Sequence, residues 1–394
     1  MSTVEERLAK LSDQVAVIGV GETDYPGDYA ASRAGQVRTD AYGLATTAFS
    51  RALADAGMDK SEVDGLIVGQ PLAYERTAEI LGIEPRWGGS ADAVNAIVQS
   101  VLVITSRMAD TVAVVYGNDQ RSVGTAYGGP NAMGGAAFLN YVYYAPWGMT
   151  SQGGLYALST QRYMQLHGTT PEDLGQISVA QRQFASLNPN AVMRKPITLE
   201  DYLAAPYIAE PLRLYDYCMI NDGGVALILT TKDRARRGPS PAVTIKAVGK
   251  ADENTDATSL RPRLMTFYHE GHHRVRDQVY NSASIGPDDI DVLGIYDSFS
   301  CHVLFALEGF GFCPEGEAGA FIRERGIGPG GGLPINTHGG HLSHSYMQGW
   351  AHQVEAVRQA RGQCGERQRP GARHVQYISD VAGKVVSVIY GSDA

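Results

Sequence analysis

The feature that most constrains the fold is an alternation of short apolar runs with helical stretches, which occurs twice along the chain. In the first half, residues 14–21 (QVAVIGVG) and 63–70 (VDGLIVGQ) are typical of buried strands, and residues 41–57 carry apolar side chains at helical spacing and end at Gly57. In the second half, AVTIKAVGKADE echoes VAVIGVGETD, and IDVLGIYD echoes VDGLIVGQ. The pattern predicts layered α/β halves related by internal pseudo-symmetry.

The segment boundaries follow from the places where this pattern breaks. Between about residues 118 and 217, glycine, proline and tyrosine become frequent, which indicates a large insertion folded over the body. We therefore expect four segments. They are the first part of the N-terminal half (1–117), an inserted loop domain (118–217), the end of that half with a linker (218–240), and the C-terminal half (241–394).

Charge and composition exclude several classes of protein. The net charge is −9, so no basic surface favours binding to nucleic acid or to an anionic membrane. No run of about 18 apolar residues predicts a transmembrane helix, and the N-terminus lacks the cationic region of a signal peptide. The four cysteines lack C-x-x-C spacing, which favours free thiols and a cytoplasmic location.

Three motifs are considered as sites and given structural interpretations instead. HEGHH (269–273) matches the H-E-x-x-H zinc pattern, but Gly271 and the flanking residues predict a solvated polar loop, or an edge of the binding surface, that binds no metal. GIGPGGG (326–332) contains G-x-G-x-x-G, yet LPINTHGG follows it in place of a helix, so we expect a turn-rich loop. The basic segments RARR (234–237) and RPR (261–263) are typical of solvated surface.

Four stretches together resemble the thiolase superfamily, in its lipid-transfer-protein branch related to the sterol carrier protein X thiolases. They are residues 188–230 (from NPNAVMRKP to MINDGGVALILT), 295–299 (IYDSF), 333–340 (LPINTHGG) and 361–388 (from RGQCGERQ to SDVAGKVVSV). They occur in the family's order, and the resemblance covers essentially the entire chain. It implies the α/β thiolase fold, five αβαβα layers with two pseudo-symmetric halves and an inserted loop domain. It also implies a dimer formed through the N-terminal half and acyl-coenzyme A ligands.

The sequence departs from that family at its catalytic positions. Gly88 stands where a thiolase places the nucleophilic cysteine that opens a buried helix, and residues 378–383 (ISDVAG) lack the second cysteine. Without a thiolate no acyl-enzyme can form there. Tyr296 replaces the asparagine or histidine of the N-E-A-F motif. Counting from Gly340, Tyr346 replaces the histidine of the G-H-P motif.

Members of this branch that lack the catalytic cysteines are steroid side-chain-cleaving aldolases of actinobacteria. The resemblance therefore implies retro-aldol cleavage of a β-hydroxyacyl-CoA, here a 17-hydroxy steroid with a C-22 carboxyl-CoA side chain, to a 17-keto steroid and propionyl-CoA. No cofactor is implied beyond the coenzyme A of the substrate. The implied assembly is a homodimer joined by a small OB-fold, zinc-ribbon partner protein in a heterotetramer.

Tyr296 and Tyr346 are the candidate catalytic residues. By family analogy we expect Tyr346 to protonate Cα and Tyr296 to act as the base, which requires a phenol pKa below the usual value of about 10. His341, His344 and Asp297 are candidate oxyanion donors or supporting residues.

Two alternatives remain open. One is a catalytically inactive thiolase-like scaffold subunit, and the other is a cysteine-independent enzyme that condenses acyl-CoA. An inactive subunit need not keep two polar groups at the former catalytic positions, so the tyrosines favour an enzyme.

Overall fold

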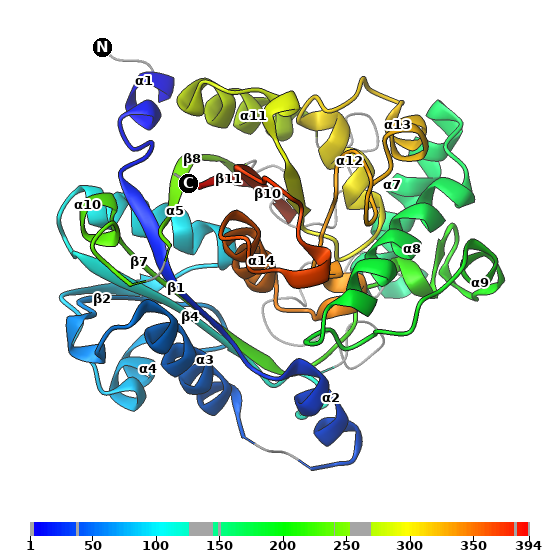
Figure 1. Cartoon of the computed structure of the whole chain (residues 1–394). Coiled ribbons are helices and arrows are strands. Elements are labelled where there is room, and N and C mark those ends of the chain that lie inside the picture. Colours follow the sequence, from blue (N-terminus) through cyan, green and yellow to red (C-terminus); the bar gives the residue numbers. More distant parts are fainter. Residues whose placement is uncertain are drawn as a thin grey trace.

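The computed structural model describes residues 4–36, 39–125, 145–148, 151–239, 241–252, 269–381 and 384–392. Their main element is a nine-stranded mixed sheet in the order β3-β2-β4-β7-β1-β8-β11-β10-β9. Strands β1 and β8 join the two halves of this sheet by a short antiparallel pairing (Figure 1). RPR (261–263) and most of residues 126–150 lie outside the described residues.

The N-terminal half contains the strands expected at residues 14–21 and 63–70 and the helix expected at residues 41–57, together with further elements. Its strands are β1 (Val15–Glu22), β2 (Gly65–Val68), β3 (Trp87–Ser90), β4 (Thr111–Asn118) and β7 (Gly223–Thr231). Its helices are α1 (Val4–Ala9), α2 (Tyr25–Arg33), α3 (Ala41–Ala56), α4 (Tyr74–Leu81), α5 (Ala93–Thr105) and α10 (Lys232–Ala235). Helix α3 ends where predicted, because Gly57 takes the left-handed conformation (φ 63°) that closes a helix. The segment RARR lies partly in α10 and partly in the turn that follows it.

The C-terminal half repeats this plan. Its strands are β8 (Val243–Asp252), β9 (Val292–Ile295), β10 (His374–Val381) and β11 (Lys384–Ser392). Its helices are α11 (His269–Ala283), α12 (Cys301–Gly309), α13 (Ala318–Arg325) and α14 (Trp350–Ala360). The order β2-β4-β7-β1 in the first half is matched by β9-β10-β11-β8 in the second, which confirms the pseudo-symmetry predicted from the repeated sequence pattern.

The layers follow from which helices contact which part of the sheet. Helix α3 packs on β1, β4 and β7, and α11 packs on β8 and β11, so these helices cover the outer faces. Helices α5 and α14 each contact strands of both halves and form the central layer (Figure 1). This arrangement has the five layers expected of the fold.

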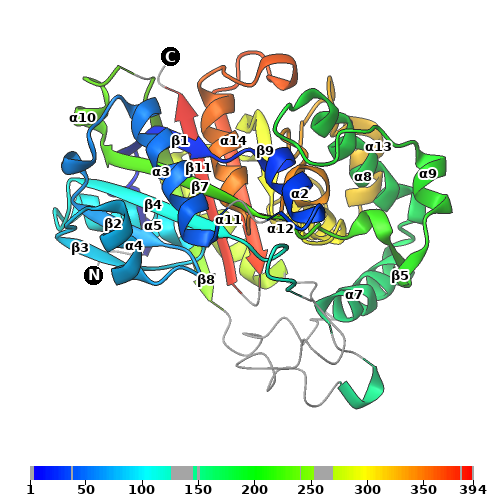
Figure 2. The ribbon, with the colours of Figure 1, turned by 90° about the horizontal axis from the view of Figure 1, so that it is seen from below.

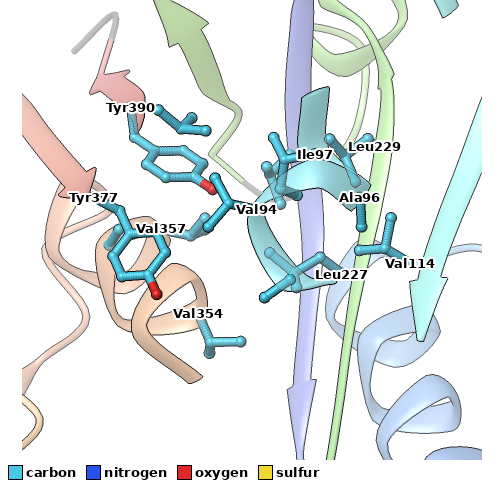
Figure 3. Close-up of a cluster of buried hydrophobic side chains, with 14 of the residues drawn as sticks. Val94, Ala96, Ile97, Val114, Leu227, Leu229, Val354, Val357, Tyr377 and Tyr390 are labelled. Carbon is cyan, nitrogen blue, oxygen red and sulfur yellow. The ribbon is translucent and has the colours of Figure 1, made fainter. Parts of the chain in front are cut away.

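The central layer is an apolar core. Side chains of α5, such as Val94 and Ile97, lie between Leu227 and Leu229 of β7 and the α14 residues Val354 and Val357 (Figure 3). Tyr377 and Tyr390 close the core from β10 and β11. Most of the α5 side chains are buried in this core, which explains the apolar character of the helix, although Leu102 is 47% exposed.

Residues between β4 and β7 form a separate group of elements. They are helices α7 (Gln152–His167), α8 (Pro171–Leu187) and α9 (Leu199–Ala204) and the hairpin of β5 (Tyr207–Ala209) and β6 (Leu212–Arg213). Figure 2 shows them beside α13, away from β2 and β3. The exact segment boundaries stay a prediction. Among the described residues, no helix has the length and apolarity that crossing a membrane requires.

One expectation about a motif is wrong. HEGHH is not a solvated loop but the first turns of α11, and His269 and His272 are buried. The reason is tertiary pairing, since the ring nitrogens of these histidines lie 3.3 Å from a Glu308 oxygen and 3.4 Å from an Asp380 oxygen, respectively. GIGPGGG is the turn-rich loop that was predicted, directly after α13.

Candidate active site

The structure brings the two candidate tyrosines, Tyr296 and Tyr346, into contact. The hydroxyl oxygens of Tyr296 and Tyr346 lie 3.1 Å apart, within hydrogen-bond distance. Tyr296 directly follows β9, and its backbone N–H donates to the Ile378 carbonyl (2.8 Å), which continues the parallel pairing of β9 with β10. Tyr346 lies between a π-helical turn (Gly340–His344) and α14. Residues 50 apart in sequence thus form one pair.

The glycines before Tyr346 allow its segment to approach Asp297. Gly339 and Gly340 have φ angles of 112° and 61°, a region that favours glycine. A Cβ atom on Gly340 would lie 2.2 Å from a carboxylate oxygen of Asp297. That carboxylate accepts the backbone N–H groups of His341 (2.9 Å) and Leu342 (3.4 Å). Asp297 therefore fixes the start of the π-helical turn that leads to Tyr346.

His341 lies against both tyrosines. Its ring centroid is 4.7 Å from that of Tyr296 and 5.0 Å from that of Tyr346, both near edge-on. Its Nε2 accepts a hydrogen bond from the Gly349 backbone N–H (2.9 Å), so the ring proton is on Nδ1, 3.4 Å from Asp297. Burial, and then the neighbouring His352, lower the pKa of His341 well below its usual value. His341 is a neutral, oriented ring beside the pair.

His344, the second candidate histidine, points elsewhere. Its ring packs edge-on against Tyr25 (5.1 Å between centroids) and His338 (4.8 Å), and its Nδ1 is 3.0 Å from the Ser345 hydroxyl. The structure therefore groups Asp297 and His341 with the tyrosine pair and places His344 against other rings.

The ionisation of Tyr296 differs from expectation. Burial, and then the adjacent Tyr346 hydroxyl, raise the pKa of Tyr296 well above its usual value. A role as base was expected to require a lowered pKa at this phenol, but removal from water raises the pKa instead. Tyr296 is therefore a neutral phenol at physiological pH, and any role as a base must avoid a standing phenolate.

The described residues include one trio whose ligand atoms could hold a metal ion, namely Asp297, His341 and His352, with all three atoms within 4.8 Å of one another. His352 Nε2 lies 3.0 Å from Asp297, as a donor to a carboxylate would. The Gly349 N–H occupies the one lone pair of His341, so its Nδ1 carries hydrogen toward Asp297. A hydrogen-bonded carboxylate explains the trio better than a cation, and the expected absence of a metal stays a prediction.

The cysteines are poor candidates for nucleophiles. Burial raises the pKa of Cys218 to about 12, with Asp297 adding to the effect, and burial raises that of Cys313 to about 12. The pKa values of Cys301 and Cys364 are raised by burial as well. Each thiol is therefore protonated at neutral pH, whereas nucleophilic cysteines react as thiolates.

Gly88 occupies a different element from the one expected. It lies in β3, whereas the residue that caps α5 is Asp92. A Cβ atom on Gly88 would lie 1.9 Å from the Tyr74 ring, so no side chain fits at this position without rearrangement. The prediction that Gly88 marks a lost nucleophile stays untested.

Sequence reasoning missed the residues that hold the Tyr346 backbone. The Tyr346 N–H donates to the Asn221 side chain (2.6 Å), and the Tyr346 carbonyl accepts from the Asn118 side chain (3.4 Å). Both asparagines are fully buried. Asn221 lies in the INDGG part of a stretch that resembles the thiolases, and Asn118 ends β4, so buried amides at strand ends were the available signal.

Comparisons with known proteins place the chain among thiolase-like proteins. A family model described as "Thiolase C-terminal domain-like" matches residues 255–390. The chain is 35% identical over 371 residues to the 17-hydroxy-3-oxo-4-pregnene-20-carboxyl-CoA lyase of Mycobacterium tuberculosis, covering 89% of this chain and 92% of that protein. It is 32% identical over 372 residues to the steroid side-chain-cleaving aldolase of Thermomonospora curvata, covering 90% and 92%.

Solved structures give the same result for the fold. The Ltp2-ChsH2(DUF35) aldolase superposes with a TM-score of 0.87 at 30% identity, covering 97% of this chain and 99% of that one. Human mitochondrial 3-ketoacyl-CoA thiolase superposes with a TM-score of 0.70 at 14% identity, covering 98% and 99%, which shows the fold alone.

Proposed function

Given that this chain belongs to the thiolase superfamily, as an aldolase, we propose that it cleaves the side chain of a 17-hydroxy steroid C-22 carboxyl-CoA, giving a 17-keto steroid and propionyl-CoA. The names of two relatives at 32–35% identity support this class of substrate. The observation that carries the proposal is the 3.1 Å contact between the Tyr296 and Tyr346 hydroxyls.

The reaction fits a site without a nucleophilic thiolate. A tertiary β-carbinol has no hydrogen to lose as hydride, so it cannot become the β-ketoacyl-CoA that a thiolase cleaves. Retro-aldol cleavage needs only proton transfers. The β-hydroxyl loses its proton, the Cα–Cβ bond breaks to leave a ketone and an enolate, and Cα then takes a proton.

The tyrosine pair can perform both transfers without a standing phenolate. Tyr296 accepts the β-hydroxyl proton as it passes its own proton to Tyr346, and Tyr346 delivers a proton to Cα. Both phenols are neutral before and after the cycle, which is compatible with the raised pKa of Tyr296. His341 holds the two rings in place from the edge, and Asp297 holds His341.

The proposed assembly is a homodimer formed through the N-terminal half that binds a small OB-fold, zinc-ribbon protein, giving a heterotetramer. The solved aldolase that resembles this chain is named as a complex with a DUF35 protein, which supports a partner of that kind.

The test removes each phenol hydroxyl and keeps the ring. Tyr296→Phe and Tyr346→Phe should each lower kcat by about 10²–10⁴-fold, the usual contribution of general acid–base catalysis. Substrate binding should weaken little, because these hydroxyls act mainly in the transition state. The assay follows release of propionyl-CoA and ketone from the steroid β-hydroxyacyl-CoA, with the partner protein present.

Tyr390→Phe is a matched control, since Tyr390 is also buried and donates a 2.8 Å hydrogen bond to Gln353, outside the pair. It should keep near wild-type kcat. If both pair variants cleave as fast as this control, the tyrosines are packing residues and the proton transfers are carried out by other groups. If wild-type enzyme forms the β-hydroxyacyl-CoA but does not cleave it, the condensing alternative replaces the proposal.

A further inference from the structure

A second hydrogen-bonded row of polar side chains begins two residues after Tyr296. The Ser298 hydroxyl lies 3.1 Å from Nε2 of His302, and Nδ1 of His302 lies 2.7 Å from a carboxylate oxygen of Asp380. Ser298 is 8% exposed, whereas His302 and Asp380 are 0% and 2% exposed. Ser298 is therefore the end of this row that lies nearest to solvent.

The hydrogen-bond partners favour one tautomer of the His302 ring. Burial by itself would raise the pKa of Asp380, but His302 and His272 lower it overall, so the carboxylate is ionised. An ionised carboxylate accepts from Nδ1–H of His302, which leaves the lone pair of Nε2 directed at the Ser298 hydroxyl. This is the tautomer that a general base for serine requires.

Aromatic rings hold His302 in that orientation. Its ring centroid is 4.5 Å from that of Tyr156, 6.1 Å from that of Phe299 and 5.9 Å from that of Tyr296. His272 of the HEGHH motif lies 3.4 Å from the second Asp380 oxygen and supports the acid from α11. The HEGHH motif thus supports the Asp380 end of this row.

A neighbouring serine shows that the arrangement is specific. Ser300 donates to the carboxylate of Asp216 (2.5 Å), so its hydroxyl contacts an acid directly and has no imidazole base. Of these two serines, only Ser298 contacts a histidine base that a buried carboxylate orients.

We propose that Ser298, His302 and Asp380 form a serine nucleophile site that hydrolyses short acyl esters. The Ser298 oxygen attacks the acyl carbonyl as its proton moves to Nε2 of His302, and the alcohol or thiol leaves with that proton. Water then attacks the acyl-serine as His302 takes its proton, and His302 returns that proton to the departing Ser298 oxygen, which releases the carboxylic acid and restores the serine hydroxyl. The part of this proposal that includes coenzyme A thioesters as substrates rests on the proposed function.

The experiment uses the full-length protein and two readouts. A fluorophosphonate should modify wild-type protein at Ser298, located by peptide mass spectrometry, and p-nitrophenyl propionate should be hydrolysed. Ser298→Ala should lose the label and lower kcat/KM for the ester by about 10³-fold. Asp380→Asn should lower it as well, while Ser300→Ala, the matched serine, should keep both label and hydrolysis.

Ser298→Cys guards against misfolding of the alanine variant, because it keeps the size of the side chain and should make ester hydrolysis sensitive to iodoacetamide. A label on another residue, no label, or equal ester hydrolysis by Ser298→Ala would overturn the proposal. Tyr346→Phe should keep ester hydrolysis while losing aldol cleavage, so failure of one proposal is distinct from failure of the other.

Discussion

Replacing Gly340 by alanine should damage both stability and the active site. The residue has φ of 61°, where an L side chain costs about 1–2 kcal/mol. The new Cβ atom would also lie 2.2 Å from an Asp297 oxygen and 2.6 Å from a Gln181 oxygen. Relieving that overlap requires Asp297 to move by about 1 Å, and overpacking of a closed site typically costs a further 1–3 kcal/mol or so.

Gly330→Ala is the matched control. Gly330 has φ of 78°, but a Cβ atom there meets nothing within 4 Å. It should therefore lose only the backbone cost of about 1–2 kcal/mol, against about 2–5 kcal/mol for Gly340→Ala, measured by urea unfolding.

Activity should separate the two variants further. Asp297 holds the backbone N–H of His341, and a shift of about 1 Å in a positioned group can cost about 10²-fold in rate. Gly340→Ala should therefore lower aldol cleavage about 10²-fold, while Gly330→Ala keeps the wild-type rate. Equal stability and equal rates for the two variants would refute the idea that the lack of a side chain at Gly340 makes room for the Asp297 carboxylate.

Acid should destabilise the protein below about pH 6.5, because burial lowers the pKa of His338 and the unfolded chain then binds protons that the folded chain does not. His338→Leu should reduce the slope of unfolding free energy against pH by about 1.4 kcal/mol per unit, and an unchanged slope would contradict this. Arg367→Ala should cost about 3–5 kcal/mol in urea unfolding, since it strands the buried Glu355, whereas loss of the exposed Arg76–Glu79 pair should cost less than about 1 kcal/mol. Iodoacetamide should leave aldol cleavage largely intact, and inactivation that substrate prevents would implicate a thiol.

Several features were predictable from local sequence. Strands β1, β2, β8 and β9 and helix α3 followed from runs and spacings of apolar residues, and Gly57 marked the end of the helix. The repeated strand pattern predicted two related halves. The wrong prediction for HEGHH shows the limit of this approach, since a glycine lowers helix propensity by only about 1 kcal/mol and pairing with Glu308 and Asp380 outweighs it.

The order of the residues accounts for the pattern of elements, and it singles out Tyr296 and Tyr346 as candidate catalytic residues. The packing of distant elements brings Tyr296 and Tyr346 into contact, groups His341 but not His344 with them, and joins Ser298 to His302 and Asp380. The difference is one of range. Periodicity reports which face of one element is buried, whereas a hydrogen bond between residues 50 or 78 positions apart depends on how separate elements pack. Burial then sets the pKa of each group, which no spacing in the sequence reveals.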